Sequence, residues 1–283
     1  MERIINAERL YSNIKELLEK QNDIKEVRKQ LGIIHLRILQ RDVMKRTKER
    51  DCAKELVVYN KIAFYLLTKL TNFEYDEAVY FEGMEIAAFC FEVLFKTKMY
   101  EPQEEVEYGV FSSICYALAE NQANSIIMAN KVLENYEEYC ITGKYIYLYT
   151  LFLARKFKKI SRMVVADDTV IKEIVSFSKS MIYRNEKKNY LSGLEDVLFQ
   201  LRDEESEDYY MFRLIYLVAK RMDICSIRNL LIDNSELVDY IDVLTQKEIR
   251  NVFELWQSQK FLFDAMEQIK ETEDIFFLSL PTS

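Results

Sequence analysis

Glycine and proline are scarce in this chain, with five glycines and two prolines among 283 residues. Both residues interrupt helices, because proline lacks the backbone N–H and glycine costs conformational entropy when it is ordered. Ordinary proteins contain about 7% glycine and about 5% proline, and collagen-like or disordered chains contain more. The scarcity therefore excludes those two classes. Together with abundant Leu, Glu, Lys, Ile and Tyr, it predicts an all-α fold, a multi-helix bundle or an irregular helical array.

Recognisable metal and redox motifs are also absent. The chain has one histidine, His35, and five cysteines, Cys52, Cys90, Cys115, Cys140 and Cys225. No two cysteines have C-x-x-C spacing, which excludes the usual zinc sites and dithiol redox motifs. The odd cysteine count favours buried free thiols in a reducing cytoplasm. We interpret His35 as a structural or surface residue, because no Ser or Cys partner motif accompanies it.

Long uncharged segments are missing as well. No run of 18 or more residues is free of charged or strongly polar side chains, and the N-terminus has no apolar core of signal-peptide length. We therefore expect a cytoplasmic protein without a membrane-spanning segment. The net charge is −8 and the pI is about 5.1. Such a surface does not attract phosphate backbones over its whole extent, so any nucleic-acid contact needs a local basic patch.

Apolar side chains recur with the 3.6-residue period along most of the sequence. The pattern predicts a helix through Ala7 and Leu18, a break at Gly32, and a buried central helix over 76–98 that is apolar on most sides. Asp167 or Asp168 is a candidate N-cap of a later helix, and Thr245 with Glu248 forms a T-x-x-E capping pattern. Further helices are expected at 56–70, 104–118, 125–139, 145–157, 194–201, 209–221, 227–240, 245–256 and 258–270.

Carboxylate runs such as Glu104-Glu105 and Asp203-Glu204-Glu205 are interpreted as solvated helix termini and loops. Tyr145, Tyr147 and Tyr149 alternate, as in a single-strand stacking platform. Alternate residues do not share a helix face, however, so core packing is favoured for these tyrosines.

The character of the chain changes near residue 251. Residues 274–280, Asp-Ile-Phe-Phe-Leu-Ser-Leu, form a short apolar run with polar residues before it, which is typical of a buried parallel strand. The segment Trp256-Gln257-Ser258-Gln259 precedes this strand by some 20 residues, and Leu280-Pro281-Thr282-Ser283 follows directly. We therefore predict a helical accessory domain over 1–250, with a subdivision near 160–168, and the start of a second domain over 251–283.

These motifs, in this order, resemble the start of the motor core of superfamily 2 helicases of the DEAD/DEAH type. In that family an aromatic-x-x-Gln element and a helix lead into a strand that ends in a Pro-Thr-Gly/Ser phosphate loop. The helicase subunit of Hachiman-type anti-phage systems has this kind of architecture. The resemblance covers roughly the last 30 residues. Gln257 departs from it, because the nearest look-alikes have proline there.

The resemblance implies a nucleotide site. Gln259 would read the adenine edge of ATP with its amide, and Trp256 would pack beside the base. Pro281, Thr282 and Ser283 would begin the phosphate loop, which in the family binds ATP and Mg²⁺. The Gly, Lys and Thr that complete the loop would follow Ser283. We therefore expect an α/β RecA-like domain that this chain only begins, and no ATP hydrolysis by the chain alone.

Two basic stretches are candidates for contact with DNA or RNA. The first includes Arg41, Lys45 and Arg46, and the second includes Arg155, Lys156, Lys158 and Lys159. The alternative for both is a solvated helix face. Two functions remain open: a helical accessory domain of an ATP-dependent helicase, or a helical module that binds a partner protein without any motor.

Overall fold

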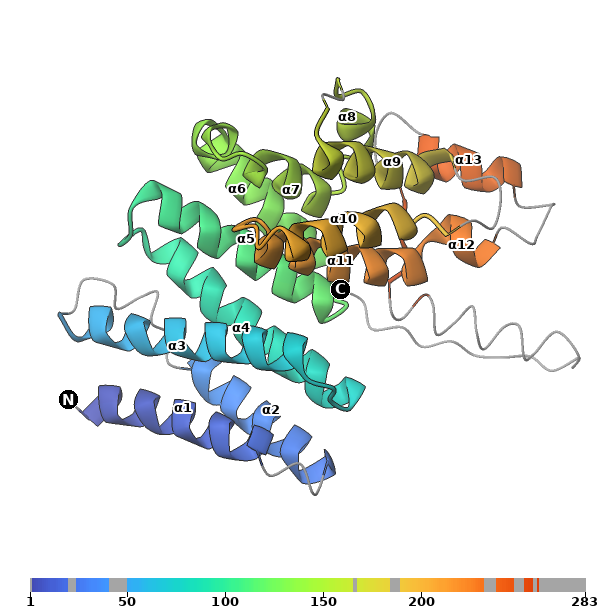
Figure 1. The fold of residues 1–283 in the computed structure, drawn as a ribbon. Helices are drawn as coiled ribbons and strands as arrows, with labels where there is room; N and C mark the ends of the chain where they lie inside the picture. The colour runs from blue at the N-terminus through green and yellow to red at the C-terminus, as the bar shows by residue number, and fades with distance from the viewer. Residues whose placement is uncertain are drawn as a thin grey trace, which may run out of the picture. The chain divides into compact units, whose positions relative to one another are not determined.

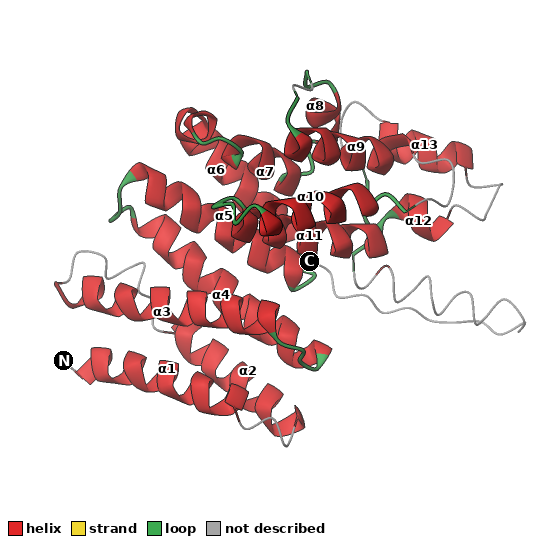
Figure 2. Ribbon diagram, in the orientation of Figure 1, coloured by secondary structure: helices red, strands yellow, loops and turns green. Residues whose placement is uncertain are grey.

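The computed structural model describes residues 2–19, 24–40, 50–164, 167–183, 189–231, 238–246, 252–256 and 259. Within these residues every regular element is a helix, and the only β-type pairing is an isolated bridge between Ser226 and Glu254 (Figure 2). The prediction of an all-α array is confirmed. The strand expected at 274–280 lies outside the described residues. Among the helices of the described part, none is both long and apolar enough to cross a membrane.

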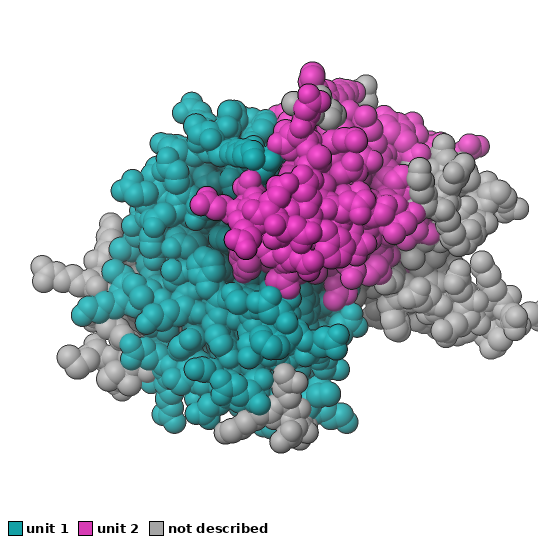
Figure 3. All heavy atoms as spheres, viewed as in Figure 1, with its two compact units in different colours: residues 1–156 teal, residues 157–283 magenta. Residues whose placement is uncertain are grey.

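The chain divides into two compact units, Met1–Lys156 and Phe157–Ser283 (Figure 3). The predicted subdivision near 160–168 lies slightly further along the chain, and the predicted start of a second domain lies at 251.

In the first unit, each helix packs mainly against its neighbours in sequence. Helix α3 packs on α4, α4 on α5, α5 on α6 and α6 on α7, while α1 and α2 cover α3 and α4 (Figure 1). The helices of this unit are α1 (Glu2–Glu19), α2 (Ile24–Gln40), α3 (Arg50–Asn72), α4 (Glu77–Thr97), α5 (Pro102–Leu118), α6 (Gln122–Thr142) and α7 (Ile146–Leu153).

Helix α4 is the centre of this unit, as its apolar sequence predicts. The Asp76 carboxylate caps its first turn by accepting the Ala78 N–H at 3.0 Å. Phe91 is fully buried and packs against Phe64 and Phe111, with ring centroids 5.0 and 5.3 Å away. Contacts of this kind between rings contribute about 0.5–1.5 kcal/mol each beyond the area they bury. The aromatic residues thus join α3, α4 and α5.

The break expected at Gly32 does not occur, because α2 continues from Ile24 to Gln40. A glycine inside a helix costs about 0.8–1 kcal/mol relative to alanine but does not end it when the neighbouring turns are well packed. Here Leu31 and Ile34 are buried on either side of Gly32 and hold the helix on the unit. Tertiary packing outweighs the local preference.

The sequence pattern predicts a continuous helix over 145–157, but the boundary between the two units falls inside this range. Helix α7 ends at Leu153, and Arg155 has a left-handed φ of 55°, which separates α7 from α8. Asp168 then caps α9 as expected, accepting the Ile171 N–H at 3.1 Å. The helices of this unit are α8 (Phe157–Ser161), α9 (Thr169–Tyr183), α10 (Ser192–Asp203), α11 (Tyr209–Cys225), α12 (Ile227–Leu231) and α13 (Val238–Gln246).

Core packing accounts for the clustered tyrosines, as the helical context predicts. Tyr145 and Tyr149 are buried, and the Tyr147 hydroxyl donates to Glu137 Oε1 at 2.9 Å on the surface. Cys90, Cys115, Cys140 and Cys225 are buried free thiols, again as expected.

Candidate nucleotide-binding element

The segment 252–256 pairs with the junction between α11 and α12. The Leu255 N–H donates to the Cys225 carbonyl at 2.8 Å, and the Ile227 N–H donates to the Phe253 carbonyl at 3.0 Å. These bonds satisfy main-chain groups that the end of one helix and the start of the next leave unpaired. Residues 252–256 are therefore extended and held to the helical unit. The helix expected over 245–256 is wrong for this part.

A small apolar cluster reinforces the pairing. Ile227 of α12, Ile241 of α13 and Leu255 are buried together, and Leu244 and Val252 pack against them. The Val252 N–H also donates to the Leu244 carbonyl at 3.1 Å. Burial of each large aliphatic side chain contributes about 1.5–3 kcal/mol. The cluster thus fixes the extended segment to both α12 and α13.

Thr245 does not cap a following helix, contrary to the prediction from the T-x-x-E pattern. It lies in the last turn of α13, fully buried, and its hydroxyl donates to the Ile241 carbonyl at 2.9 Å. A threonine inside a helix bonds the carbonyl four residues earlier in this way. The spacing to Glu248 cannot distinguish that arrangement from a cap, and Glu248 lies outside the described residues.

Trp256 and Gln259 follow the anchored segment directly. Trp256 is exposed, with 45% of its surface accessible, and its main-chain N–H donates to Gln259 Oε1 at 2.9 Å. An amide group has two acceptor positions and two donor hydrogens, so this bond occupies one of four. The structure therefore joins the two predicted residues by one hydrogen bond. An exposed indole and an amide held by the main chain of the same residue are suited to a flat ring with a polar edge.

The other residues assigned to the nucleotide by resemblance, Pro281, Thr282 and Ser283, lie outside the described residues, as do Gln257 and Ser258. Their role stays a prediction.

The second basic stretch does not act as one surface. Arg155 is buried, and its Nη1 donates to the Leu153 carbonyl at 2.7 Å, so its guanidinium closes the end of α7. Arg155 is therefore not part of an exposed basic patch, and its contact with nucleic acid stays an untested prediction. The backbone at Arg155 is left-handed, with a φ of 55°.

The neighbouring lysines differ from Arg155. Lys158 donates to the Gln246 carbonyl at 2.5 Å, at the end of α13, and cations at helix C-termini are stabilising there. Lys156 and Lys159 are exposed and stay candidates for a phosphate contact. Arg41, Lys45 and Arg46 lie outside the described residues.

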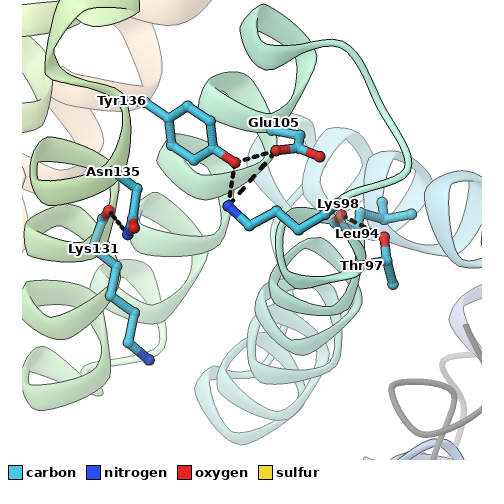
Figure 4. A network of polar contacts seen from close by, with 7 residues as sticks. All are labelled: Leu94, Thr97, Lys98, Glu105, Lys131, Asn135 and Tyr136. Atoms are coloured by element: carbon cyan, nitrogen blue, oxygen red, sulfur yellow. Dashed lines mark hydrogen bonds and ion pairs between the residues drawn. The ribbon is translucent and has the colours of Figure 1, made fainter.

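Sequence reasoning missed a buried polar network between α4, α5 and α6 (Figure 4). The Tyr136 hydroxyl donates to the Glu105 carboxylate and accepts from the Lys98 ammonium, which also lies 3.8 Å from that carboxylate. Only 5% of the Glu105 side chain is exposed. The prediction that Glu104 and Glu105 are both solvated is wrong for Glu105. No sequence motif distinguishes Glu104 from Glu105. Glu105 is buried because its position along α5 places it on the inner face of the helix.

The backbone is irregular at two residues of this network. Lys98 adopts the left-handed conformation at the C-cap of α4, with a φ of 54°. Tyr136 has φ −141° and ψ 25° inside α6, so the helix is kinked there. At this kink the Tyr136 phenol reaches Glu105. Without its hydrogen bond, the buried Glu105 carboxylate would have only the more distant Lys98 ammonium to stabilise its charge.

His35 is a paired, partly buried residue, in agreement with its structural interpretation. Its Nδ1 lies 3.0 Å from Glu82 Oε1, which joins α2 to α4. Within the described residues, no group of three or more His, Cys, Asp or Glu side chains is placed to hold a metal ion.

Several tyrosines should ionise unusually late. Burial, together with a hydrogen bond to Glu195, raises the pKa of Tyr216 to about 12, and burial with the nearby Glu19 charge raises the pKa of Tyr65 to about 12. Burial also raises the pKa of Tyr116 and Tyr136, and each donates to a carboxylate. A raised pKa means that folding favours the neutral phenol.

We therefore expect the stability contributions of Tyr216 and Tyr65 to be complete below pH 10 and to be lost as the pH rises through about 12. A pH titration followed by absorbance at 295 nm should show two steps of tyrosine ionisation in the folded chain, one near pH 10 and a later one. In denaturant the later step should merge with the first. Tyr216→Phe should reduce the amplitude of the late step. A single step near pH 10 in the folded chain would contradict this expectation.

Comparison with known proteins finds nothing similar: no family model, no curated protein and no solved structure matches the chain.

Proposed function

We propose that this chain is the helical accessory region of an ATP-dependent nucleic-acid helicase, and that Trp256 and Gln259 contact the adenine base of the nucleotide. The observation that carries the proposal is the hydrogen bond from the Trp256 main-chain N–H to the Gln259 side chain, with Trp256 itself exposed. Adenine offers a flat ring and an edge that carries both a donor and an acceptor. An indole and an amide fixed in one turn complement both features.

The anchoring of the turn also supports the proposal. Three main-chain hydrogen bonds and a buried apolar cluster hold residues 252–255, so Trp256 follows a segment that is fixed to the helices. Fixing the binding groups before the ligand arrives reduces the entropy lost on binding. A nucleotide site shared with a following domain requires such a fixed point.

The single tryptophan makes this proposal testable by fluorescence, because all indole emission comes from Trp256. Titration with adenosine and with ATP should quench the emission with similar dissociation constants, on the order of millimolar, since the base alone is recognised. Guanosine should quench less, because its edge presents a different pattern of donors and acceptors.

Gln259→Ala should weaken adenosine binding by roughly two- to tenfold, the equivalent of one hydrogen-bonded group at about 0.5–1.5 kcal/mol. Gln200→Ala is the matched control, because Gln200 is an exposed glutamine on α10 that bonds only the neighbouring Glu204 at 2.9 Å. Equal quenching by adenosine and guanosine, unchanged in Gln259→Ala, would refute the adenine contact. That result would favour the alternative, a helical module that binds a partner protein.

A further inference from the structure

Arg228 is a buried cation close to the point where the Trp256 segment meets the helices. Only 2% of its surface is exposed, and its Nη2 donates to Asp242 Oδ1 and to Thr245 Oγ1, each at 2.5 Å. A buried guanidinium is costly unless it is paired and hydrogen-bonded. Both acceptors come from α13, so the side chain joins α12 to α13.

The backbone beside Arg228 makes the second connection. Ile227, the preceding residue, donates its N–H to the Phe253 carbonyl at 3.0 Å. Val252, in turn, donates to the Leu244 carbonyl of α13 at 3.1 Å. Helix α12, helix α13 and the extended segment are therefore bonded pairwise, and the Arg228 side chain supplies the ion pair between α12 and α13.

Thr245 extends this arrangement to α9. Its hydroxyl oxygen, which accepts from Arg228, also lies 3.3 Å from the Ile182 carbonyl near the end of α9. Asp242 is 40% exposed, in contrast to Arg228, so loss of the arginine would leave its carboxylate in contact with water. Removal of Arg228 should therefore loosen α13 without leaving an isolated buried anion.

We infer that Arg228 is a positioning residue for the Trp256–Gln259 turn. By fixing α13 against α12, its guanidinium sets the path of residues 252–255 and hence the orientation of Trp256. Arg228 itself does not touch the nucleotide. The inference rests on the proposed function for its effect on adenosine binding, but the placement of Trp256 can be measured without any ligand.

The first test is therefore made without nucleotide. Arg228→Met keeps an unbranched side chain but removes both hydrogen bonds, and should increase the acrylamide quenching constant of Trp256 and lower its fluorescence anisotropy. Arg228→Lys retains the charge and should restore part of the change, because an ammonium can donate to Asp242. Arg202→Met is the matched control, since Arg202 is an exposed arginine on α10 that stacks on Phe199.

The second test uses adenosine. Arg228→Met should weaken adenosine binding about as much as Gln259→Ala does, and combining the two should add little, because a misplaced turn cannot use its amide. If Arg228→Met does not fold, Asp242→Asn removes the charge at a half-exposed position but keeps the acceptor oxygen for Arg228, and should show the same effects to a smaller extent.

The outcomes separate the two proposals. A lower melting temperature with unchanged Trp256 quenching, anisotropy and adenosine affinity would show that Arg228 only stabilises the unit, and would overturn the inference. Failure of the wild-type chain to bind adenosine would refute the proposed function. In that case a change of Trp256 quenching and anisotropy in Arg228→Met would still support the positioning role, and unchanged values would overturn it.

Discussion

Replacing Tyr136 with phenylalanine should lower the free energy of unfolding by about 1.5–3 kcal/mol, the usual contribution of a hydrogen bond to a charged group. The substitution removes the hydroxyl that donates to the Glu105 carboxylate and preserves the ring. Glu105 is buried, so water cannot replace the lost donor without opening α5 from α6. The Lys98 ammonium, 3.8 Å away, compensates poorly because its own side chain is 54% exposed.

Chemical denaturation of the purified variants measures this effect. Tyr147→Phe is the matched control, because its hydroxyl also donates to a glutamate, Glu137, but on the surface. Surface substitutions of this kind change stability by less than about 0.5 kcal/mol. If Tyr136→Phe and Tyr147→Phe cost the same, the buried network contributes no more than an exposed pair, and its assigned role in joining α4, α5 and α6 is wrong.

Gly109→Ala should destabilise the first unit by about 1–3 kcal/mol, which is the usual cost of overpacking a close-packed core. A Cβ at this position would overlap Val132 Cγ2 and would lie 2.9 Å from Phe95 Cδ2. Both neighbours are buried, so neither can move without disturbing its own helix. Glycine at this point allows α4, α5 and α6 to approach one another closely.

Gly32→Ala provides the opposite expectation in the same unit. The nearest atom to a Cβ at Gly32 is Glu82 Oε1 at 3.9 Å, an ordinary contact. Alanine is favoured over glycine inside a helix by about 0.8–1 kcal/mol, so this variant should be more stable than the wild type. Thermal melts of the two variants should shift in opposite directions, and a shift of the same sign would contradict the packing described here.

Much of the fold could be predicted because helix formation is a local property. The sequence is apolar on most sides over 76–98, and this segment forms the central helix α4. The Asp168 cap was also predictable from the sequence, since short polar side chains before an apolar run are typical N-caps. Helix ends were less predictable. The turn at Arg155 and the continuity at Gly32 depend on contacts with other helices, which periodicity does not contain.

The candidate site was predictable only in part. The proximity of Trp256 and Gln259 follows from their sequence spacing, and the structure places them in one turn. The attachment of this turn to α11 and α12 involves residues about 30 positions apart, which no local pattern reveals. For the same reason, burial distinguishes Glu105 from Glu104 and Arg155 from Lys156, although their sequence contexts are nearly identical.

The kink at Tyr136 divides α6 into segments 122–135 and 137–142. Helices shorter than about 12–15 residues are marginally stable on their own, because a few hydrogen bonds do not offset the free energy needed to form the first turn. The shorter segment therefore depends on its tertiary contacts, in particular those of buried Cys140. Amide hydrogen exchange should consequently show 137–142 opening by local unfolding, with lower protection than 122–135, whose amides should exchange with the rest of the unit.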